Sequence, residues 1–308
     1  MAAHSASTTP QSPRTQGPTP VPLAAGLYVA ATPLGNLGDM TLRGLDTLSR
    51  VTAIACEDTR VTADLLRLLG LAVPTLISVR EHNEKRAAEG IVARIARGEA
   101  VAYVSDAGTP GVSDPGARLV ASVRAAGHVV IPVPGPSAVT AALSAAGLAG
   151  TAFTFIGFIP RDRAGRQAWL EALARCPETT VFFESPHRIE ATLLALADAF
   201  VATEPKRRVV VCRELTKRHE EIVSLEIAAL APWVEANASR VRGEFVVLVE
   251  GTSIKTPLNA LNPTLLMRML VTELPPARAA KVAARLTGLP RDTLYALAET
   301  LAASAPPR

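Results

Sequence analysis

Ser105-Asp106-Ala107-Gly108-Thr109-Pro110-Gly111-Val112-Ser113-Asp114-Pro115-Gly116 is the stretch that decides the fold. The apolar run 100–105 predicts a buried strand before it, and the periodic segment 115–126 predicts a helix after it. The Gly and Pro residues between them interrupt both elements. A strand that enters a helix through a Gly-rich loop typically holds a small ligand, with free N–H groups at the helix N-terminus. The two Asp residues disfavour phosphate and suit hydroxyls, amines or a positive centre.

Strands and helices alternate on both sides of this loop. Because parallel strands need crossover helices, the alternation predicts a parallel sheet with right-handed connections. The predicted strands are 27–32, 51–56, 75–79, 100–105 and 129–133, and the predicted helices are 41–49, 59–69, 84–97, 115–126 and 137–146.

The alternation changes near residue 149, which predicts a second α/β domain with a mixed sheet. Its predicted strands are 153–158, 180–184, 208–213, 222–227 and 245–250, and we expect 222–227 to pair antiparallel because its apolar residues alternate. The expected domains are a disordered tail (1–24), an N-terminal α/β domain (25–148), the second α/β domain (149–251), a linker (252–263) and a helical segment (264–308).

The C-terminal segment predicts helices at 264–271, 276–286 and 290–303, and the short turn between the last two is typical of a helix-turn-helix. From Thr264 onward it has six basic and three acidic residues, an excess that suits contact with RNA phosphates. The candidate residues are Lys281, Arg285 and Arg291. A helical cap or dimer contact with a solvated charged face is the alternative.

Composition excludes several classes of protein. Of the 308 residues 48% are apolar and 19% charged, which excludes global disorder, and only 4% are aromatic, which disfavours wide base-stacking platforms. The net charge of +4 favours an acidic partner slightly. Three cysteines without metal-ligand spacing predict free thiols and no metal site. We see neither a signal peptide nor a membrane span, so we expect a cytoplasmic protein.

Three loops are predicted to meet at the carboxyl edge of the first sheet, where open α/β sheets bind ligands. They are 31–38, 105–116 and 132–138, although each alone is also explained as a tight turn with a cap. Neither a dinucleotide nor a nucleoside-triphosphate fingerprint is present. The candidate binding residues are Pro33, Gly35, Asp106, Gly108, Thr109, Pro110, Ser137 and Ala138.

Short motifs spread from residue 27 to residue 251 resemble the tetrapyrrole-methylase superfamily. They are Ala-Thr-Pro-Leu-Gly-Asn (31–36), Cys-Glu-Asp-Thr-Arg (56–60), Ser-Asp-Ala-Gly-Thr-Pro (105–110), Pro-Gly-Pro-Ser-Ala (134–138), Phe-Ile-Gly-Phe-Ile-Pro (155–160), Phe-Glu-Ser-Pro-His-Arg (183–188), Arg-Glu-Leu-Thr-Lys (213–217) and Gly-Glu-Phe (243–245). Tetrapyrrole-modifying members carry Gly-Asp-Pro where this chain has Gly108-Thr109-Pro110. The chain is therefore most similar to the branch that methylates a ribose 2′-oxygen in small-subunit rRNA.

The resemblance implies a two-domain class III methyltransferase that binds S-adenosylmethionine between its domains, usually as a homodimer. It implies a cytidine ribose in the decoding region of 16S rRNA as substrate, in naked RNA or in the small ribosomal subunit. Two alternatives remain open at this point. One is methylation of a corrin or sirohaem intermediate, and the other is a non-catalytic RNA-binding assembly protein.

Methyl transfer to a ribose hydroxyl needs in-line placement and is helped by a proton acceptor. The candidate catalytic residues are Glu184, Glu214 and Lys217, and Asp106 is the strongest candidate for a cofactor ligand, with a turn cap as its alternative. Glu184 is expected either to face substrate or to pair with Arg188. The further candidates for RNA contact are Arg60, Arg188 and Arg213, for which a solvated ion-pair face is the alternative.

Overall fold

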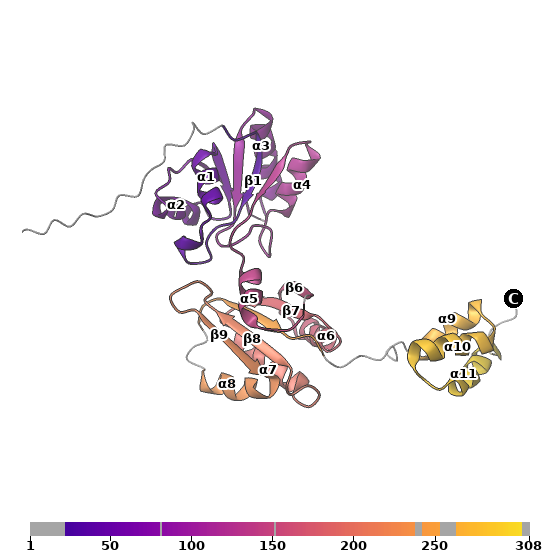
Figure 1. Cartoon of the computed structure of the whole chain (residues 1–308). Coiled ribbons are helices and arrows are strands. Elements are labelled where there is room, and N and C mark those ends of the chain that lie inside the picture. The colour runs from indigo at the N-terminus through magenta and orange to yellow at the C-terminus, as the bar shows by residue number, and fades with distance from the viewer. Residues whose placement is uncertain (1–21, 81, 151, 238–241, 253–262, 304–308) are drawn as a thin grey trace, which may run out of the picture. The chain divides into compact units, whose positions relative to one another are not determined.

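The computed structural model describes residues 22–80, 82–150, 152–237, 242–252 and 263–303. The chain divides into two compact units, Met1–Ala138 and Val139–Arg308 (Figure 1). Residues 1–21 of the predicted tail and 253–262 of the predicted linker lie outside the described residues. The domain boundaries expected from the sequence remain predictions.

The first unit contains a five-stranded sheet in the order β3-β2-β4-β1-β5, and every strand pair in it is parallel, as predicted. Since β4, β1 and β5 are neighbours, the three loops that follow them leave the same edge of the sheet. The elements are β1 (Gly26–Ala30), the short helix η1 (Leu37–Asp39), α1 (Leu42–Arg50), β2 (Ala53–Cys56), α2 (Thr59–Leu68), β3 (Thr75–Ser78), α3 (Glu84–Ala96), β4 (Ala100–Val104), α4 (Ala117–Ala125) and β5 (Val130–Val133).

Helices cover both faces of this sheet. Leu48 of α1 and Leu66 of α2 pack on one face, and Ile91 of α3 and Leu119 of α4 pack on the other. Central strands buried on both faces are apolar throughout, and all five residues of β4 are buried. This is why the run before the Gly-rich loop is continuously apolar.

The second unit contains a mixed five-stranded sheet in the order β6-β7-β10-β8-β9. Only β6 and β7 are parallel, and β9 pairs antiparallel with β8, as predicted. Helices α6, α7 and α8 share one core with this sheet, around Leu170, Leu193, Leu230 and Phe182. The elements are α5 (Ala138–Ala146), β6 (Phe153–Phe158), α6 (Arg163–Leu173), β7 (Thr179–Glu184), α7 (Ile189–Phe200), β8 (Arg208–Arg213), β9 (Glu221–Glu226), η2 (Ile227–Ala229), α8 (Leu230–Ala236) and β10 (Phe245–Val249).

Three C-terminal helices pack around a small core of their own, which includes Met267, Ala280 and Leu294. The turn between the last two helices contains Gly288 in the left-handed conformation, as expected of a short helix–helix turn. The helices are α9 (Pro263–Glu273), α10 (Pro276–Thr287) and α11 (Arg291–Ala303). In the part of the chain that the structure describes, no helix has the length and apolar character needed to cross a membrane.

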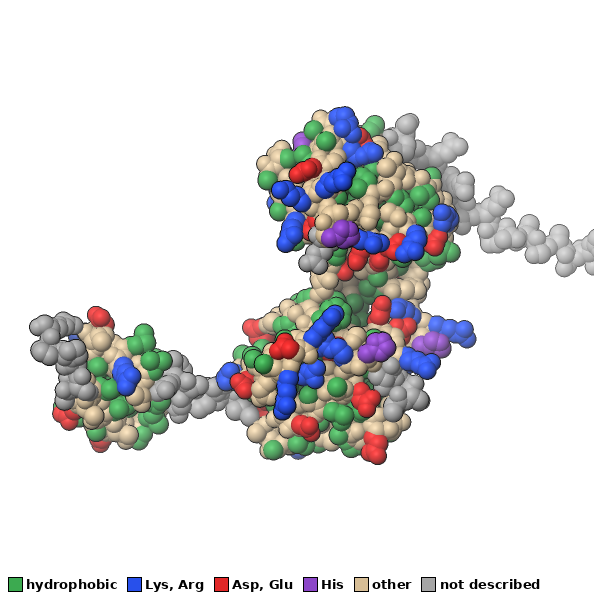
Figure 2. All heavy atoms as spheres, turned by 180° about the vertical axis from the view of Figure 1, so that it is seen from behind, with side chains coloured by type: hydrophobic (Ala, Val, Ile, Leu, Met, Phe, Trp, Pro, Cys, Tyr) green, Lys and Arg blue, Asp and Glu red, His purple; other side chains and the backbone are tan. Residues whose placement is uncertain are grey.

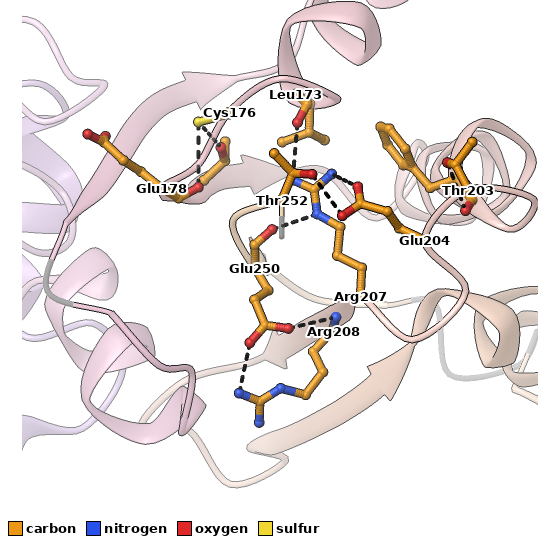
Figure 3. A network of polar contacts seen from close by, with 11 residues as sticks. Leu173, Cys176, Glu178, Thr203, Glu204, Arg207, Arg208, Glu250 and Thr252 are labelled. Atoms are coloured by element: carbon orange, nitrogen blue, oxygen red, sulfur yellow. Dashed lines mark hydrogen bonds and ion pairs between the residues drawn. The ribbon is translucent and has the colours of Figure 1, made fainter. Parts of the chain in front are cut away.

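A buried ion pair fixes the point at which the chain leaves the second sheet (Figure 3). The guanidinium of Arg207 contacts the Glu204 carboxylate at 3.1 Å and donates hydrogen bonds to the carbonyls of Glu250 and Leu173. The hydroxyl of Thr252 donates to the other oxygen of Glu204 at 2.8 Å. Thr252, the first residue of the predicted linker, is therefore part of the folded unit.

Candidate active site

The loops after β1 and β4 are joined by a short backbone bridge. The N–H of Thr32 donates to the Gly108 carbonyl at 2.9 Å, and the N–H of Gly108 donates back to Thr32 at 3.0 Å. The Thr32 hydroxyl also donates to the carbonyl of Ser105. These bonds hold the first half of the Gly-rich stretch against the first loop.

The loop after β5 is tied to the same stretch. The hydroxyl of Thr109 donates to the Pro136 carbonyl at 2.8 Å, so all three predicted loops meet. Gly108 has a φ of 80°, and a Cβ atom there would lie 3.0 Å from Leu34 Cδ2. Glycine therefore suits position 108 both because of its positive φ and because a Cβ atom would crowd Leu34.

The predicted cofactor-binding residues gather around this meeting point, with different exposure. Pro33, Gly108 and Pro110 are buried, Asp106, Thr109, Ser137 and Ala138 are half-buried, and Gly35 is exposed.

A fourth loop, between β2 and α2, joins the group through Asp106. The carboxylate of Asp106 accepts a hydrogen bond from the Asp58 N–H at 3.2 Å. Asp58 is the N-cap of α2, and the side chain and N–H of Arg60 hold the pKa of its carboxyl well below the usual range. Arg60, a candidate for RNA contact, is thus paired with Asp58, although its side chain remains 85% exposed.

The expectation of free N–H groups at the helix after the Gly-rich loop is wrong. One carboxylate oxygen of the buried Glu84, at the start of α3, accepts the N–H groups of Gly116, Arg118 and Leu119 at 3.0–3.1 Å. An acidic side chain suits a helix N-terminus because the helix dipole is positive there. This helix also begins at Ala117 instead of Pro115, and its N-terminus serves packing between α3 and α4.

Two further carboxylates lie in electrostatic range of Asp106: Asp114, the second Asp of the Gly-rich stretch, and Glu57, which was not among the candidates from the sequence. Burial, together with the charges of Glu57 and Asp106, raises the pKa of Asp114 to about 6. Burial and Asp106 also raise the pKa of Glu57, while Arg80 opposes the shift. Glu57 follows β2 and lies within the motif 56–60, so its position at this edge of the sheet was the available signal. The result is a site that favours a cationic ligand.

The raised pKa of Asp114 predicts a pH-dependent stability. Between about pH 4 and 6 the folded protein holds a proton that the unfolded chain has released, so stability falls as pH rises through this range. Asp114→Asn removes the ionisable group. We expect the variant to unfold at a higher temperature than the parent protein at pH 7.5, with the advantage shrinking towards pH 4. A difference in melting temperature that is the same at both pH values would contradict this assignment.

Glu184, a candidate catalytic residue at the end of β7, is buried and fully engaged within its own unit. One carboxylate oxygen accepts the N–H of Ser185, and the other accepts the Thr192 hydroxyl, both at 2.8 Å. Arg188 lies 3.4 Å from the second oxygen. Of the two alternatives from the sequence, the structure shows the pair with Arg188.

Glu214 and Lys217 form a connected group with Glu244, which the sequence analysis had not singled out. The ammonium of Lys217 lies 3.0 Å from a carboxylate oxygen of each glutamate. Glu214 Oε1 also accepts the backbone N–H of Glu244 at 2.8 Å. Glu214 and Thr216 both have positive φ, so this loop is held in a conformation that side chains rarely adopt.

The charges of this group are set by their contacts. Burial opposes ionisation of Glu214, but the Glu244 N–H and Lys217 outweigh it and lower the pKa of the carboxyl. Burial opposes the charge of Lys217 as well, and the two glutamates outweigh it and raise the pKa of the ammonium. Glu214 is therefore an ionised acceptor and Lys217 a protonated donor.

The remaining candidates for RNA contact differ in their surroundings. Arg213 donates to the Arg242 carbonyl at 2.6 Å and lies 3.7 Å from Glu221. Lys281 and Arg285 are exposed on α10, and Arg291 is exposed at the start of α11. Within the described residues, no group of three or more His, Cys, Asp and Glu side chains is arranged to hold a metal ion.

Comparison with known proteins agrees with the motifs. The model of the Tetrapyrrole (Corrin/Porphyrin) Methylases matches residues 26–231, and the model of the RsmI C-terminal HTH domain matches residues 265–302. Ribosomal RNA small subunit methyltransferase I of Xylella fastidiosa is 44% identical over 269 residues, which cover 87% of this chain and 97% of that protein. The chain belongs to the ribosomal RNA small subunit methyltransferase I family.

Solved structures agree with this family in fold. The methyltransferase CobJ matches with a TM-score of 0.56 and 24% identity, covering 74% of this chain and 95% of that chain. Uroporphyrin-III C-methyl transferase from Thermus thermophilus, complexed with S-adenyl homocysteine, matches with a TM-score of 0.51 and 17% identity over 72% of this chain and 96% of that chain. This ribosomal RNA small subunit methyltransferase I family member is thus a methyltransferase with the tetrapyrrole-methylase fold, and S-adenosylmethionine is the cofactor of these methylases.

Proposed function

We propose that this protein transfers a methyl group from S-adenosylmethionine to the ribose 2′-oxygen of a cytidine in the decoding region of 16S rRNA. The observation that carries the proposal is 44% identity over nearly the whole length of a ribosomal RNA small subunit methyltransferase I. The match to a C-terminal helix-turn-helix model supports the same choice over a tetrapyrrole substrate. We further propose that the enzyme acts as a cytoplasmic homodimer on the rRNA or on the small subunit.

The residues at the three joined loops fit the cofactor. S-adenosylmethionine carries a positively charged sulfonium and an amino group, and the carboxylates near Asp106 complement positive charge. Gly108 keeps the backbone open where a Cβ atom would meet Leu34. Asp106, Gly108, Thr109 and Pro110 would hold the cofactor, together with Pro33, Gly35, Ser137 and Ala138 of the neighbouring loops. When bound, it supplies an electrophilic methyl group.

The second unit supplies the acid–base chemistry in this proposal. Glu214 Oε1 is occupied by Lys217 and the Glu244 N–H, so we assign Oε2 as the atom that accepts the proton of the ribose hydroxyl. Lys217 remains protonated, so it cannot itself accept the proton, and its role is to orient the Glu214 carboxylate. Glu184 takes no direct part, because its oxygens are committed to Ser185 and Thr192.

Mapping ribose methylation in rRNA tests the proposed function directly. Small-subunit rRNA from cells with and without the gene is compared nucleotide by nucleotide for 2′-O-methylation. We expect one decoding-region cytidine to lose its methyl group in the deletion strain and to regain it with purified enzyme and S-adenosylmethionine. An unchanged methylation map would refute an rRNA target.

Deleting the C-terminal helices is expected to weaken substrate binding without affecting the cofactor. Lys281 and Arg285 lie four residues apart on α10, where basic side chains gain affinity by releasing counterions from phosphates. The truncation should end after Thr252, because this residue bonds Glu204 within the second unit. We expect lower RNA affinity with a shallower salt dependence, measured by filter binding, and unchanged cofactor affinity by calorimetry. If RNA affinity and its salt slope are unchanged, the helices form a cap without an RNA-binding role.

A further inference from the structure

A bulge in strand β6 presents an aromatic ring to solvent. The register between β6 and β7 shifts between Phe155 and Phe158, and Gly157 within the bulge has a φ of 69°. Bulges commonly re-aim a side chain at the edge of a sheet, and β6 is an edge strand. Phe158 at its end is 55% exposed. The motif Phe-Ile-Gly-Phe-Ile-Pro thus produces an exposed ring that the proposed chemistry does not use.

Packing against Phe183 fixes the orientation of the exposed Phe158 ring. Phe158 packs edge-to-face on Phe183 with ring centroids 5.7 Å apart, and Phe155 packs edge-to-face on the same ring at 4.9 Å. A ring positioned in this way gives up little conformational freedom when a second flat group stacks on it.

The backbone after the ring is clamped by Arg188. One guanidinium nitrogen donates to the carbonyls of Ile159 and Pro160 at 3.0 and 3.1 Å, and the same nitrogen faces the buried Glu184. Glu184, a candidate for catalysis, and Arg188, a candidate for RNA contact, thus form an ion pair that supports the segment carrying Phe158. Glu184 and Arg188 are positioning residues for this segment.

The segment that follows the ring is rich in positive charge. Arg161 and Arg163 are exposed, and Asp162 between them is committed as the N-cap of α6 through the Gly165 N–H at 2.7 Å. Figure 2 shows Lys and Arg side chains gathered on one face of the second unit. A protein interface would call for a continuous apolar patch, whereas the exposed Phe158 ring is followed along the chain by two exposed arginines.

We propose that Phe158 stacks on an unpaired base of the rRNA substrate while Arg161 and Arg163 contact the adjoining phosphates. This rests on the proposed function and names the residue that places the RNA strand. Aromatic rings beside cationic side chains are the usual means by which proteins hold single-stranded RNA, because every base offers a π face and every nucleotide a phosphate. One stacking residue is compatible with a chain that has few aromatic side chains.

The test separates stacking from ordinary apolar packing by removing the aromatic ring while keeping an apolar side chain. Phe158→Leu is expected to raise the KM for small subunits about five- to tenfold, with unchanged kcat and unchanged S-adenosylmethionine affinity. Phe158→Tyr keeps a π face and is expected to behave as the parent protein. Phe153→Leu is the matched control, since Phe153 is 45% exposed at the opposite end of the same strand. Binding of a single-stranded oligoribonucleotide is measured alongside and should follow the same order.

Three results would contradict stacking of Phe158 on RNA or separate it from the proposed function. If Phe158→Leu binds RNA as the parent does, or if its sedimentation shows altered assembly, the ring packs against protein and the inference is overturned. If Phe153→Leu is impaired equally, the effect is not specific to the bulge, and the inference also fails. If the parent enzyme does not methylate small subunits at all, the proposed function fails, and the oligoribonucleotide affinities alone then decide on stacking.

Discussion

Replacing Arg207 with alanine is expected to lower the free energy of unfolding of the second unit by about 3–5 kcal/mol. The Arg207 side chain is 2% exposed and the Glu204 side chain 7%. Removing the guanidinium takes the charged partner away from the buried Glu204 carboxylate, which accepts the Thr252 hydroxyl on its other oxygen. It also leaves the Leu173 and Glu250 carbonyls without that donor. An unpaired buried charge costs far more than the pair itself contributes.

Trp169 and Trp233, the only two tryptophans of the chain, report the unfolding of this unit, because both pack against its core. Their fluorescence is followed during denaturant titration. The matched control is Arg208→Ala, since Arg208 pairs with Glu250 at the same 3.1 Å distance but with side chains 37% and 26% exposed. An exposed pair of this kind contributes about 0–1 kcal/mol. Equal losses in the two variants would mean that burial of the Arg207 pair has no energetic consequence.

The strands of both sheets were predictable because their signals are local. Buried parallel strands are apolar throughout, as in β4, and half-exposed antiparallel strands alternate, as in β9. The rule that ligand loops follow the carboxyl ends of strands also placed three loops together correctly, because β4, β1 and β5 are neighbours.

The features that escaped prediction depend on contacts between residues far apart in the sequence. Glu84 caps a helix that begins more than thirty residues later, so the helix N-terminus expected to bind a ligand is occupied. Glu244 joins Lys217 across 27 residues. The sequence allowed Glu184 either to face substrate or to pair with Arg188. The fold of the turn between β7 and α7 brings Arg188 to the carboxylate.

The group of carboxylates around Asp106 also depends on residues far apart in the sequence. Asp106 and Asp114 were identified within the Gly-rich stretch, but the charge around them depends also on Glu57. Glu57 follows a different strand, and the parallel pairing of β2 with β4 brings the loops after these two strands to the same edge of the sheet. The positive character expected of the ligand therefore rests on more carboxylates than the motif alone reveals.

The second large effect is expected at the joined loops, where Gly108→Val should weaken binding of S-adenosylmethionine or its demethylated product at least tenfold, or about 1.4 kcal/mol. A side chain at φ 80° is strained, and its Cβ would lie 3.0 Å from Leu34 Cδ2, so the Leu34 side chain has to move at the junction that the Thr32 bridge holds together. Asp106→Ala should weaken binding to a similar extent through loss of a carboxylate and of its bond to the Asp58 N–H. Calorimetry on the purified variants measures both.

Gly111→Val isolates the contribution of the contact at Gly108. Gly111 lies in the same loop with the same φ of 80°, but a Cβ atom there meets nothing within 4 Å. Both valine variants thus carry the same kind of backbone strain, and only Gly108→Val also displaces the Leu34 side chain at the junction of the loops. We expect Gly111→Val to keep most of the cofactor affinity. If it loses as much as Gly108→Val, strain in the loop is sufficient to explain the effect, and if Gly108→Val and Asp106→Ala both bind normally, the cofactor does not bind at this junction.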